Sequence, residues 1–273
     1  MRTIKAGLIT KVVARLAQEA NFVLRKDALK ALNMALKKET NKRAKSLLDS
    51  IIQNADIAKN EKLAICQDTG LAIVFVETSQ DVRIEGDLKA AIIKGVETGY
   101  RKGYLRNSIV NDPLKRGKSG YAPCVIHIDI VRGNKIKLTV LPKGFGCENK
   151  SKLKMFEPTA DIKEIKQFII NSVKEAGPDA CPPYIVGVGT GGTADYAMLL
   201  AKKALLRDIA QSKTKLEQEL LKEINRLNIG PMGLGGKTTC LGVNIEKYPT
   251  HIAGLPVAVN ISCHALRSAS AVI

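Results

Sequence analysis

The fold class of this chain is decided by residues 125–141, which read VIHIDIVRGNKIKLTVL. Apolar and polar residues alternate on both sides of Gly133-Asn134, and a period of two is typical of β-strands with one buried face. A Gly-Asn dipeptide between two such runs indicates a tight turn. The sequence therefore predicts a β-hairpin, and with it an antiparallel sheet element, in the middle of the chain.

Helical patterns surround this hairpin. Apolar residues recur three or four positions apart from residue 4 to about residue 60, and Asp87 is placed to cap a helix that ends near Lys102. Further helices are expected over 162–175 and over 193–228, where two helices meet near Gln211-Ser212, and further strands over 71–76, 184–188 and 255–261. Helices and strands do not alternate regularly, which favours an α+β fold over a doubly wound sheet. We expect a helical N-terminal region followed by mixed, partly antiparallel sheets packed by helices, in a single domain over residues 1–273.

The composition limits the classes of partner. Lys and Arg number 43 against 26 Asp and Glu, which gives a net charge of +17, but the excess is scattered and only 4% of residues are aromatic. This pattern disfavours a nucleic-acid surface and leaves an anionic small molecule or an acidic protein as the expected partner. No apolar run approaches the roughly 18 residues that a membrane-spanning helix needs. Six cysteines without a secretion signal favour reduced thiols in the cytoplasm.

The first candidate site is the segment from Ile65 to Gly70, which reads ICQDTG and precedes the strand expected over 71–76. Cys66 offers a thiolate for a soft metal, and the amide and carboxylate beside it can hold a bound molecule. A cysteine packed as a small apolar side chain is the structural alternative.

A second cysteine site is Cys181-Pro182-Pro183-Tyr184, where two prolines fix the backbone before a strand. Gly187, Gly189 and Gly192 follow in the spacing G-x-G-x-x-G, which seats a pyrophosphate in dinucleotide-binding domains. The motif comes late in the chain, and no acidic residue ends a second strand about 20 residues further on. A glycine-rich helix entrance can also bind other anions, including a carboxylate.

Other glycine-rich and cysteine-containing segments give weaker signals. Residues 142–150 end the second run of the hairpin in a glycine-rich turn with flanking lysines, which is either an anion nest or an ordinary turn. Residues 230–239 imitate a P-loop, but the first glycine stands one position too early and Pro231 removes an N–H donor, so ATP binding there is rejected. Cys263 and His264 are adjacent, but no C-x-x-C or H-x-x-x-H spacing occurs, so a structural zinc site is not expected.

Taken in order, these motifs resemble those of the iron-sulfur hydro-lyases of the class I fumarase and L-tartrate dehydratase family. The resemblance runs from about residue 60 to the end of the chain and includes Lys143-Gly144-x-Gly146 and Gly235-Gly236-Lys237. It implies that three cysteines hold a 4Fe-4S cluster, namely Cys66, Cys181 and Cys263. The remaining cysteines, Cys124, Cys147 and Cys240, would then not be cluster ligands.

The resemblance also implies a chemistry for the site. Three thiolates on a four-iron cluster leave one iron open, and that iron acts as a Lewis acid on a 2-hydroxy dicarboxylate that loses water. The residues implied in substrate binding are Gln67, Asp68, Arg106, the amides near Gly144 and Gly146, and His251. Asp68 would in addition act in catalysis, by orienting or protonating the leaving hydroxyl.

The sequence ends at Ile273, ten residues after Cys263, whereas the resemblance leads us to expect a second domain that carries the catalytic base. We therefore expect an α subunit that is active with a separate β subunit, in an α2β2 assembly. Fumarate hydratase, which interconverts (S)-malate and fumarate in the tricarboxylic acid cycle, is the first reading. L-tartrate dehydratase is the alternative. A dinucleotide-dependent oxidoreductase and a basic binding module without catalytic activity are remote alternatives from other classes.

Overall fold

The computed structural model describes residues 2–211 and 213–273, and internal contacts divide the chain into two compact units. Unit 1 comprises Met1–Arg25, Ala55–Phe145 and Arg267–Ile273, and unit 2 comprises Lys26–Asn54 and Gly146–Leu266. The expected single domain over residues 1–273 stays a prediction. The two helices expected over 193–228 are present, but their meeting point includes residue 212, which lies outside the described residues.

The N-terminal region is helical, as predicted, except at its start. Its helices are α1 (Ala6–Phe22), α2 (Lys26–Lys38) and α3 (Lys42–Glu61). Helix α1 belongs to unit 1 and α2 to unit 2, whereas α3 contributes residues to both. Residues Arg2–Lys5 form a short strand, β1, where the periodicity had predicted helix from residue 4. Strand β1 pairs in parallel with β3 (Val82–Glu85), so a distant partner overrides the local preference.

Unit 1 is built on a four-stranded mixed sheet with the order β12-β7-β2-β6. Its strands are β2 (Leu71–Ser79), β6 (Val125–Val131), β7 (Ile136–Lys143) and β12 (Ala269–Val272). Strand β2 is central and almost entirely buried, which explains its continuous apolar run. The helix expected at Asp87 is α4 (Leu88–Lys102), and the Asp87 side chain accepts a hydrogen bond from the backbone N–H of Ala90, as an N-cap does.

The predicted hairpin over residues 125–141 is wrong in its pairing, although both of its strands exist. Strand β2 lies between β6 and β7, parallel to β6 and antiparallel to β7, so the two runs do not pair with each other. The Gly133-Asn134 segment still reverses the chain, and the N–H of Asp81 donates to the carbonyl of Gly133. Local alternation identifies a strand but does not identify its neighbour.

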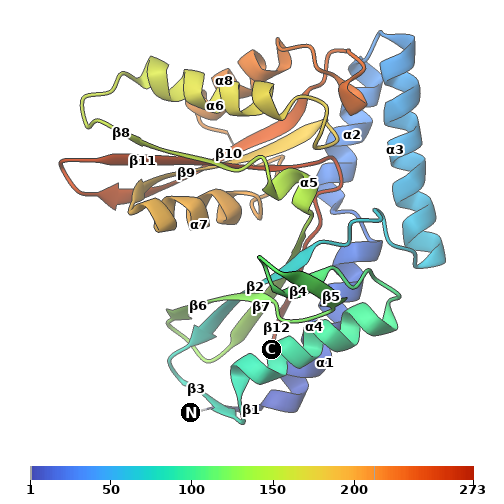
Figure 1. The fold of residues 1–273 in the computed structure, drawn as a ribbon, viewed down its shortest axis with the longest axis vertical. Coiled ribbons are helices and arrows are strands. Elements are labelled where there is room, and N and C mark those ends of the chain that lie inside the picture. Colours follow the sequence, from blue (N-terminus) through green and yellow to red (C-terminus); the bar gives the residue numbers. More distant parts are fainter. Residues whose placement is uncertain (1, 212) are drawn as a thin grey trace. The chain divides into compact units, whose positions relative to one another are not determined.

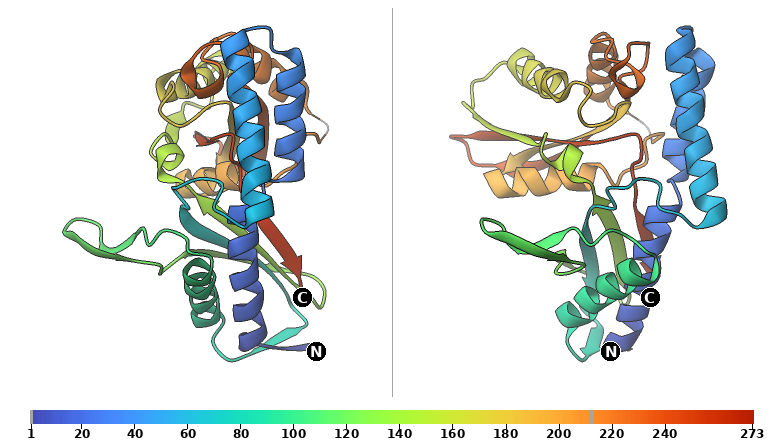
Figure 2. Two further views of the ribbon diagram at one scale, coloured as in Figure 1. Left: turned by 90° about the vertical axis from the view of Figure 1, so that its right-hand side faces the viewer. Right: turned by 45° about the vertical axis from the view of Figure 1, so that its right-hand side comes forward.

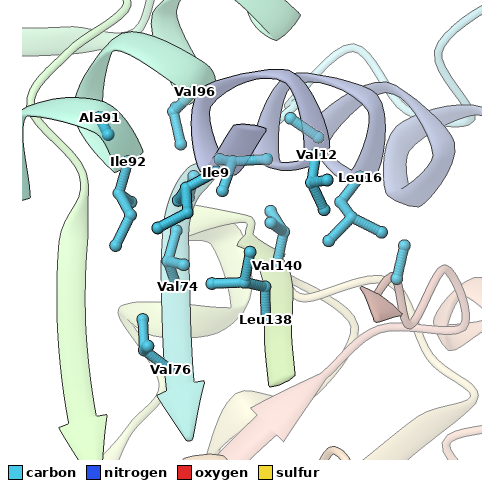
Figure 3. Close-up of a cluster of buried hydrophobic side chains, with 14 of the residues drawn as sticks. Ile9, Val12, Leu16, Val74, Val76, Ala91, Ile92, Val96, Leu138 and Val140 are labelled. Atoms are coloured by element: carbon cyan, nitrogen blue, oxygen red, sulfur yellow. The ribbon is translucent and has the colours of Figure 1, made fainter. Parts of the chain in front are cut away.

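Helices α1 and α4 pack together and cover the sheet of unit 1 (Figures 1 and 3). Figure 3 shows Ile9, Val12 and Leu16 of α1 facing Leu138 and Val140 of β7. Burial of such side chains stabilises the fold by about 1.5–3 kcal/mol each. A two-stranded hairpin, β4 (Ile109–Asp112) and β5 (Arg116–Gly120), projects away from this sheet (Figure 2).

Unit 2 is a second four-stranded mixed sheet, of order β10-β9-β11-β8, with helices on both faces. Its elements are α5 (Phe145–Glu148, whose first residue closes unit 1), β8 (Lys152–Phe156), α6 (Ile162–Ala176), β9 (Tyr184–Gly192), α7 (Ala194–Ala204), α8 (Lys215–Asn225), the 3-10 turn η1 (Pro231–Gly233), β10 (Cys240–Thr250) and β11 (Leu255–Ser262). Helix α7 covers one face, and α6 and α8 cover the other (Figure 1). The mixed sheets and their helical layers confirm the predicted α+β class.

The G-x-G-x-x-G segment of unit 2 lies inside β9, under helix α7. A Cβ atom at Gly187 would lie 2.1 Å from the carbonyl oxygen of Ala201, and one at Gly189 would lie 2.0 Å from that of Ala197. Both glycines therefore allow α7 to approach the strand closely. Helix packing accounts for them without a bound dinucleotide.

Candidate active site

The loop that carries Cys66 lies in unit 1, between helix α3 and strand β2. Its entry is fixed by Ile65, whose N–H donates to the carbonyl of Asn21 at 3.0 Å. Its exit is fixed by Gly70, which has a φ of +73° and whose Cβ would lie 2.7–2.8 Å from the backbone of Lys143. Only glycine fits there, because Leu71 opens β2 opposite Lys143 of β7. We call residues Ile65–Gly70 the Cys66 loop.

Asp68 braces this loop with both carboxylate oxygens. Oδ1 accepts the N–H of Gly70 at 3.0 Å, and Oδ2 accepts the N–H of Phe145 at 2.8 Å. A Cβ at Gly144 would lie 3.1 Å from Asp68 Oδ2. Unit 1 thus brings together Asp68 and Gly144, two of the residues predicted for the substrate site. The glycine-rich turn after β7, for which the sequence left an anion nest and an ordinary turn open, leads into the single-turn helix α5, and the N–H of Phe145 donates to Asp68.

Thr69 connects the Cys66 loop to Arg106 and Tyr100 by hydrogen bonds. The Thr69 side chain is buried, and its Oγ1 accepts the N–H of Arg106 at 3.0 Å. The Tyr100 hydroxyl lies 2.9 Å from the carbonyl oxygen of Thr69 and 3.2 Å from that of Gly70. Burial raises the pKa of Tyr100 to about 12, so it stays a neutral donor at physiological pH. Gln67 and Arg106, which are next to members of this network in the chain, are exposed.

Cys181 and Cys263 lie in unit 2, at one end of its sheet. Cys181 precedes β9 and Cys263 follows β11, and these antiparallel strands pair Ile185 with Ser262. The carbonyl oxygen of Cys181 accepts the N–H of His264 at 3.4 Å and lies 3.1 Å from its Nδ1. Sheet register therefore brings the two predicted ligands together.

The backbone of Cys181 adopts a φ of +57°, in the left-handed region. A cysteine in that conformation is strained, at a cost of about 1–2 kcal/mol. Its N–H donates to the carbonyl of Pro178, and the N–H of Met232 donates to the carbonyl of Pro182, so the surrounding turn imposes the conformation. Strain that the surrounding structure imposes is characteristic of functional positions.

Two of the predicted substrate contacts lie elsewhere in unit 2. Gly146 follows the first residue of α5, and a Cβ added there would lie 4.0 Å from the carbonyl oxygen of Asp179. His251 is exposed in the turn between β10 and β11, where its Nδ1 accepts the N–H of Ala253. That turn lies at the opposite end of the sheet from Cys181, and the nine residues of β9 span about 25 Å. Unit 2 itself does not bring His251 together with Cys181 and Cys263.

The three remaining cysteines have surroundings that suit neutral thiols. Burial raises the pKa of Cys124 to about 11 and that of Cys240 to about 12. Cys147 is buried, and its Sγ donates to the carbonyl of Ala180 at 3.4 Å. A thiolate is the form that binds metal, and burial in apolar surroundings disfavours it. Cys66, Cys181 and Cys263 are only half-buried, and no disulfide involves any of the six cysteines.

Within residues 2–211 and 213–273, no three His, Cys, Asp or Glu side chains gather closely enough to hold a metal ion. Cys66 belongs to unit 1, whereas Cys181 and Cys263 belong to unit 2.

No helix in the described part of the chain combines the length and the apolar character that crossing a membrane requires.

Two residues that contact the Cys66 loop, Tyr100 and Arg267, are not among those predicted from the sequence. In the sequence Tyr100 occupies an ordinary apolar position of an amphipathic helix. Nothing in that pattern indicates that its hydroxyl contacts the backbone of the Cys66 loop. Arg267 is a buried cation whose Nη2 donates to the carbonyl of Asp68 at 2.8 Å. A single Arg between Leu266 and the strand-forming C-terminal residues was a usable signal, because a charge in an apolar segment is normally held by a partner.

Comparison with known proteins gives consistent matches. The model of the fumarate hydratase (Fumerase) family matches residues 10–272. A protein of Methanocaldococcus jannaschii named putative L(+)-tartrate dehydratase subunit alpha is 40% identical, over 96% of this chain and 96% of its own. The L(+)-tartrate dehydratase subunit alpha of Escherichia coli strain K12 is 29% identical, over 95% of this chain and 88% of its own.

Proposed function

Because the chain belongs to the fumarate hydratase (Fumerase) family, and is accordingly a hydro-lyase, we propose that it is the α subunit of an L(+)-tartrate dehydratase. The match over residues 10–272 supports the reaction class, and the names of the two relatives support the substrate. This proposal reverses the order expected from the sequence, where fumarate hydratase came first. Fumarate hydratase, the description of the family model, is the second candidate.

We propose that Cys66, Cys181 and Cys263 hold a 4Fe-4S cluster, and the donor set fits this group. All three thiols are half-buried, whereas Cys147 and Cys240 are buried and burial keeps Cys124 and Cys240 protonated. Three thiolates would leave one iron open, and when bound the cluster supplies a Lewis acid for a substrate carboxylate and hydroxyl.

We propose that the residues around the Cys66 loop bind and orient the substrate. The Arg106 guanidinium is exposed, and its backbone is fixed to Thr69, so it can reach a carboxylate with a forked pair of donors. Gln67 offers an exposed amide, and Asp68 is held beside Gly144 where it can orient the leaving hydroxyl. The amides near Gly144 and Gly146, and His251, complete the proposed set.

Loss of water breaks a C–O bond on one carbon and removes a proton from its neighbour. We propose that the base that takes this proton lies on a separate β subunit, and the "subunit alpha" names of the relatives support the existence of such a partner. An α2β2 assembly is the expected form, and the net charge of +17 favours an acidic partner and an anionic substrate. The expected cytoplasmic location stays a prediction.

The test measures kcat/KM for two substrates, using the complex of this chain with its β subunit purified without oxygen. We expect kcat/KM for L(+)-tartrate to exceed that for (S)-malate by at least about 100-fold, because a site built for the second hydroxyl leaves polar groups unpartnered when it is missing. A preference for malate would replace the proposal with fumarate hydratase. No turnover of either substrate would overturn both.

A further inference from the structure

Arg267 is unusual because its charged side chain is buried without an ion pair to offset the cost of removing it from water. Its side chain is only 3% exposed, and a buried guanidinium normally pairs with a carboxylate. Among the described residues, Arg267 makes no ion pair, and its Nε atom has no hydrogen-bond partner. Its two hydrogen bonds go to uncharged oxygens.

Those two oxygens belong to segments that are far apart in sequence but adjacent in unit 1. Nη1 donates to the Oδ1 of Asn21 at 3.1 Å, near the end of helix α1, and Nη2 donates to the carbonyl oxygen of Asp68 at 2.8 Å. A Cβ at Gly144 would lie 3.5 Å from Nη2. The guanidinium therefore contacts the loop residue whose carboxylate braces Gly70 and Phe145.

The partner Asn21 is itself fixed and supports the same loop. It is fully buried, its Nδ2 donates to the carbonyl of Ala17 and its own carbonyl accepts the N–H of Ile65. Asn21 thus holds the loop directly at Ile65 and, through Arg267, at Asp68. Arg267 is four residues after Cys263 in the sequence and begins the segment that forms β12.

We propose that Arg267 is a positioning residue for the Cys66 loop: its buried guanidinium, held by Asn21, fixes the Asp68 backbone and places a permanent positive charge beside the loop. It acts through Asp68 and does not touch the substrate. The expected loss of turnover rests on the proposed function, whereas the expected loosening of the Cys66 loop does not. A forked, always-charged donor is needed, because lysine cannot contact Asn21 and Asp68 with the same geometry.

The experiment compares Arg267→Met, Arg267→Lys and Asn21→Ala with the wild type, each purified with the β subunit. Arg226→Met, which removes an exposed guanidinium paired with Glu223 in unit 2, is the matched control. Hydrogen exchange on peptides covering residues 65–71 and 144–148 measures the loop without reference to activity. Steady-state kinetics on L(+)-tartrate measure the consequence for turnover.

We expect amide exchange in both peptides to become at least about 10-fold faster in Arg267→Met, with smaller increases in Arg267→Lys and Asn21→Ala, and with β9 unchanged. We expect kcat to fall about 100-fold in Arg267→Met with KM within about threefold of the wild type, since the group acts on positioning. The control should match the wild type in both measurements.

Three results would overturn the proposal. Unchanged exchange at residues 65–71 in Arg267→Met would remove the structural role. A raised KM with unchanged kcat would make Arg267 a direct substrate contact. Loss of protection throughout unit 1 in Arg267→Lys and Asn21→Ala, or failure of all three variants to fold, would make it a general core residue. Absence of turnover in the wild type would refute the proposed function, and the exchange result would still decide the role of Arg267.

Discussion

The Cys66 loop and the strand ends that carry Cys181 and Cys263 are held in place by different kinds of interaction. The loop in unit 1 depends on hydrogen bonds from side chains on several elements, with Asp68 and Tyr100 as the main contributors. The strand ends in unit 2 depend on sheet register and on the close approach of α7 to β9. One proposed set of ligands is thus positioned in two ways, and substitutions that break one should leave the other intact.

The largest effect is expected from loss of close packing in unit 2. In Gly189→Val the new Cβ would lie 2.0 Å from the backbone oxygen of Ala197, so α7 must move away from β9. We expect a loss of more than about 3 kcal/mol in the free energy of unfolding. Denaturant unfolding followed by circular dichroism measures it.

The matched control is Gly7→Ala. Gly7 lies exposed in helix α1, and nothing is within 4 Å of an added Cβ. Gly7 is in the first turn of the helix and contacts nothing with its new Cβ, so we expect a change of less than about 0.5 kcal/mol there. If Gly189→Val were as stable as the wild type, close packing would not be what holds the strand ends.

The next effect is expected from Asp68, which braces the loop in unit 1. Asp68→Ala leaves the N–H groups of Gly70 and Phe145 without their acceptors, at a cost of about 1–3 kcal/mol in stability. Turnover should fall at least about 100-fold, because the proposed catalytic carboxylate is also lost. Thermal unfolding and steady-state kinetics check the two parts separately. Asp49→Ala, on the exposed face of α3, should change neither, and wild-type turnover in Asp68→Ala would contradict a role in the site.

A smaller effect concerns Cys124, whose half-buried thiol packs against the core of unit 1. Burial raises its pKa from 9.0 to about 11, so the folded chain keeps a proton that the unfolded chain releases. The free energy of unfolding should therefore fall as pH rises from 9 to 11, by up to about 2 kcal/mol from this thiol. Denaturant unfolding of wild type and Cys124→Ala across this range should show a shallower decline in the variant. Equal slopes would contradict the raised pKa.

The smallest effect is expected at Asp87, which caps the helix that carries Tyr100. Asp87→Ala removes the acceptor for the N–H of Ala90 and should cost about 1 kcal/mol. Asp87→Asn retains an acceptor and should cost less. Thermal unfolding separates them, and equal losses in both variants would show that the negative charge matters more than the cap.

Much of the local structure could be predicted from the sequence, because it follows local rules. The periodicity of α6, the Asp87 cap and the strand after Gly70 all depend on neighbours within a few residues. The insertion of β2 between β6 and β7 could not be predicted, since alternation carries no information about strand order. For the same reason, the pairing of β12 with β7 and that of β1 with β3 could not be predicted.

The candidate site shows the same division. Cysteines, the glycine-rich turns and Asp68 have recognisable neighbours in the sequence, and in the structure Asp68 lies beside Gly144. Tyr100 and Arg267 act through contacts between segments far apart in the chain, so no local pattern identifies the atoms that they contact. Gly187 and Gly189 show the converse, because spacing alone does not separate a phosphate-binding loop from a strand packed under a helix.

We propose that Cys66, Cys181 and Cys263, and not the other three cysteines, hold an iron-sulfur cluster. Iron and acid-labile sulfide, measured on oxygen-free reconstituted wild type and on each of the six Cys→Ser variants, test it most directly. We expect about four irons per chain in the wild type, Cys124→Ser, Cys147→Ser and Cys240→Ser, and loss of the cluster in Cys66→Ser, Cys181→Ser and Cys263→Ser. No cluster in the wild type, or a requirement for a different trio, would contradict it.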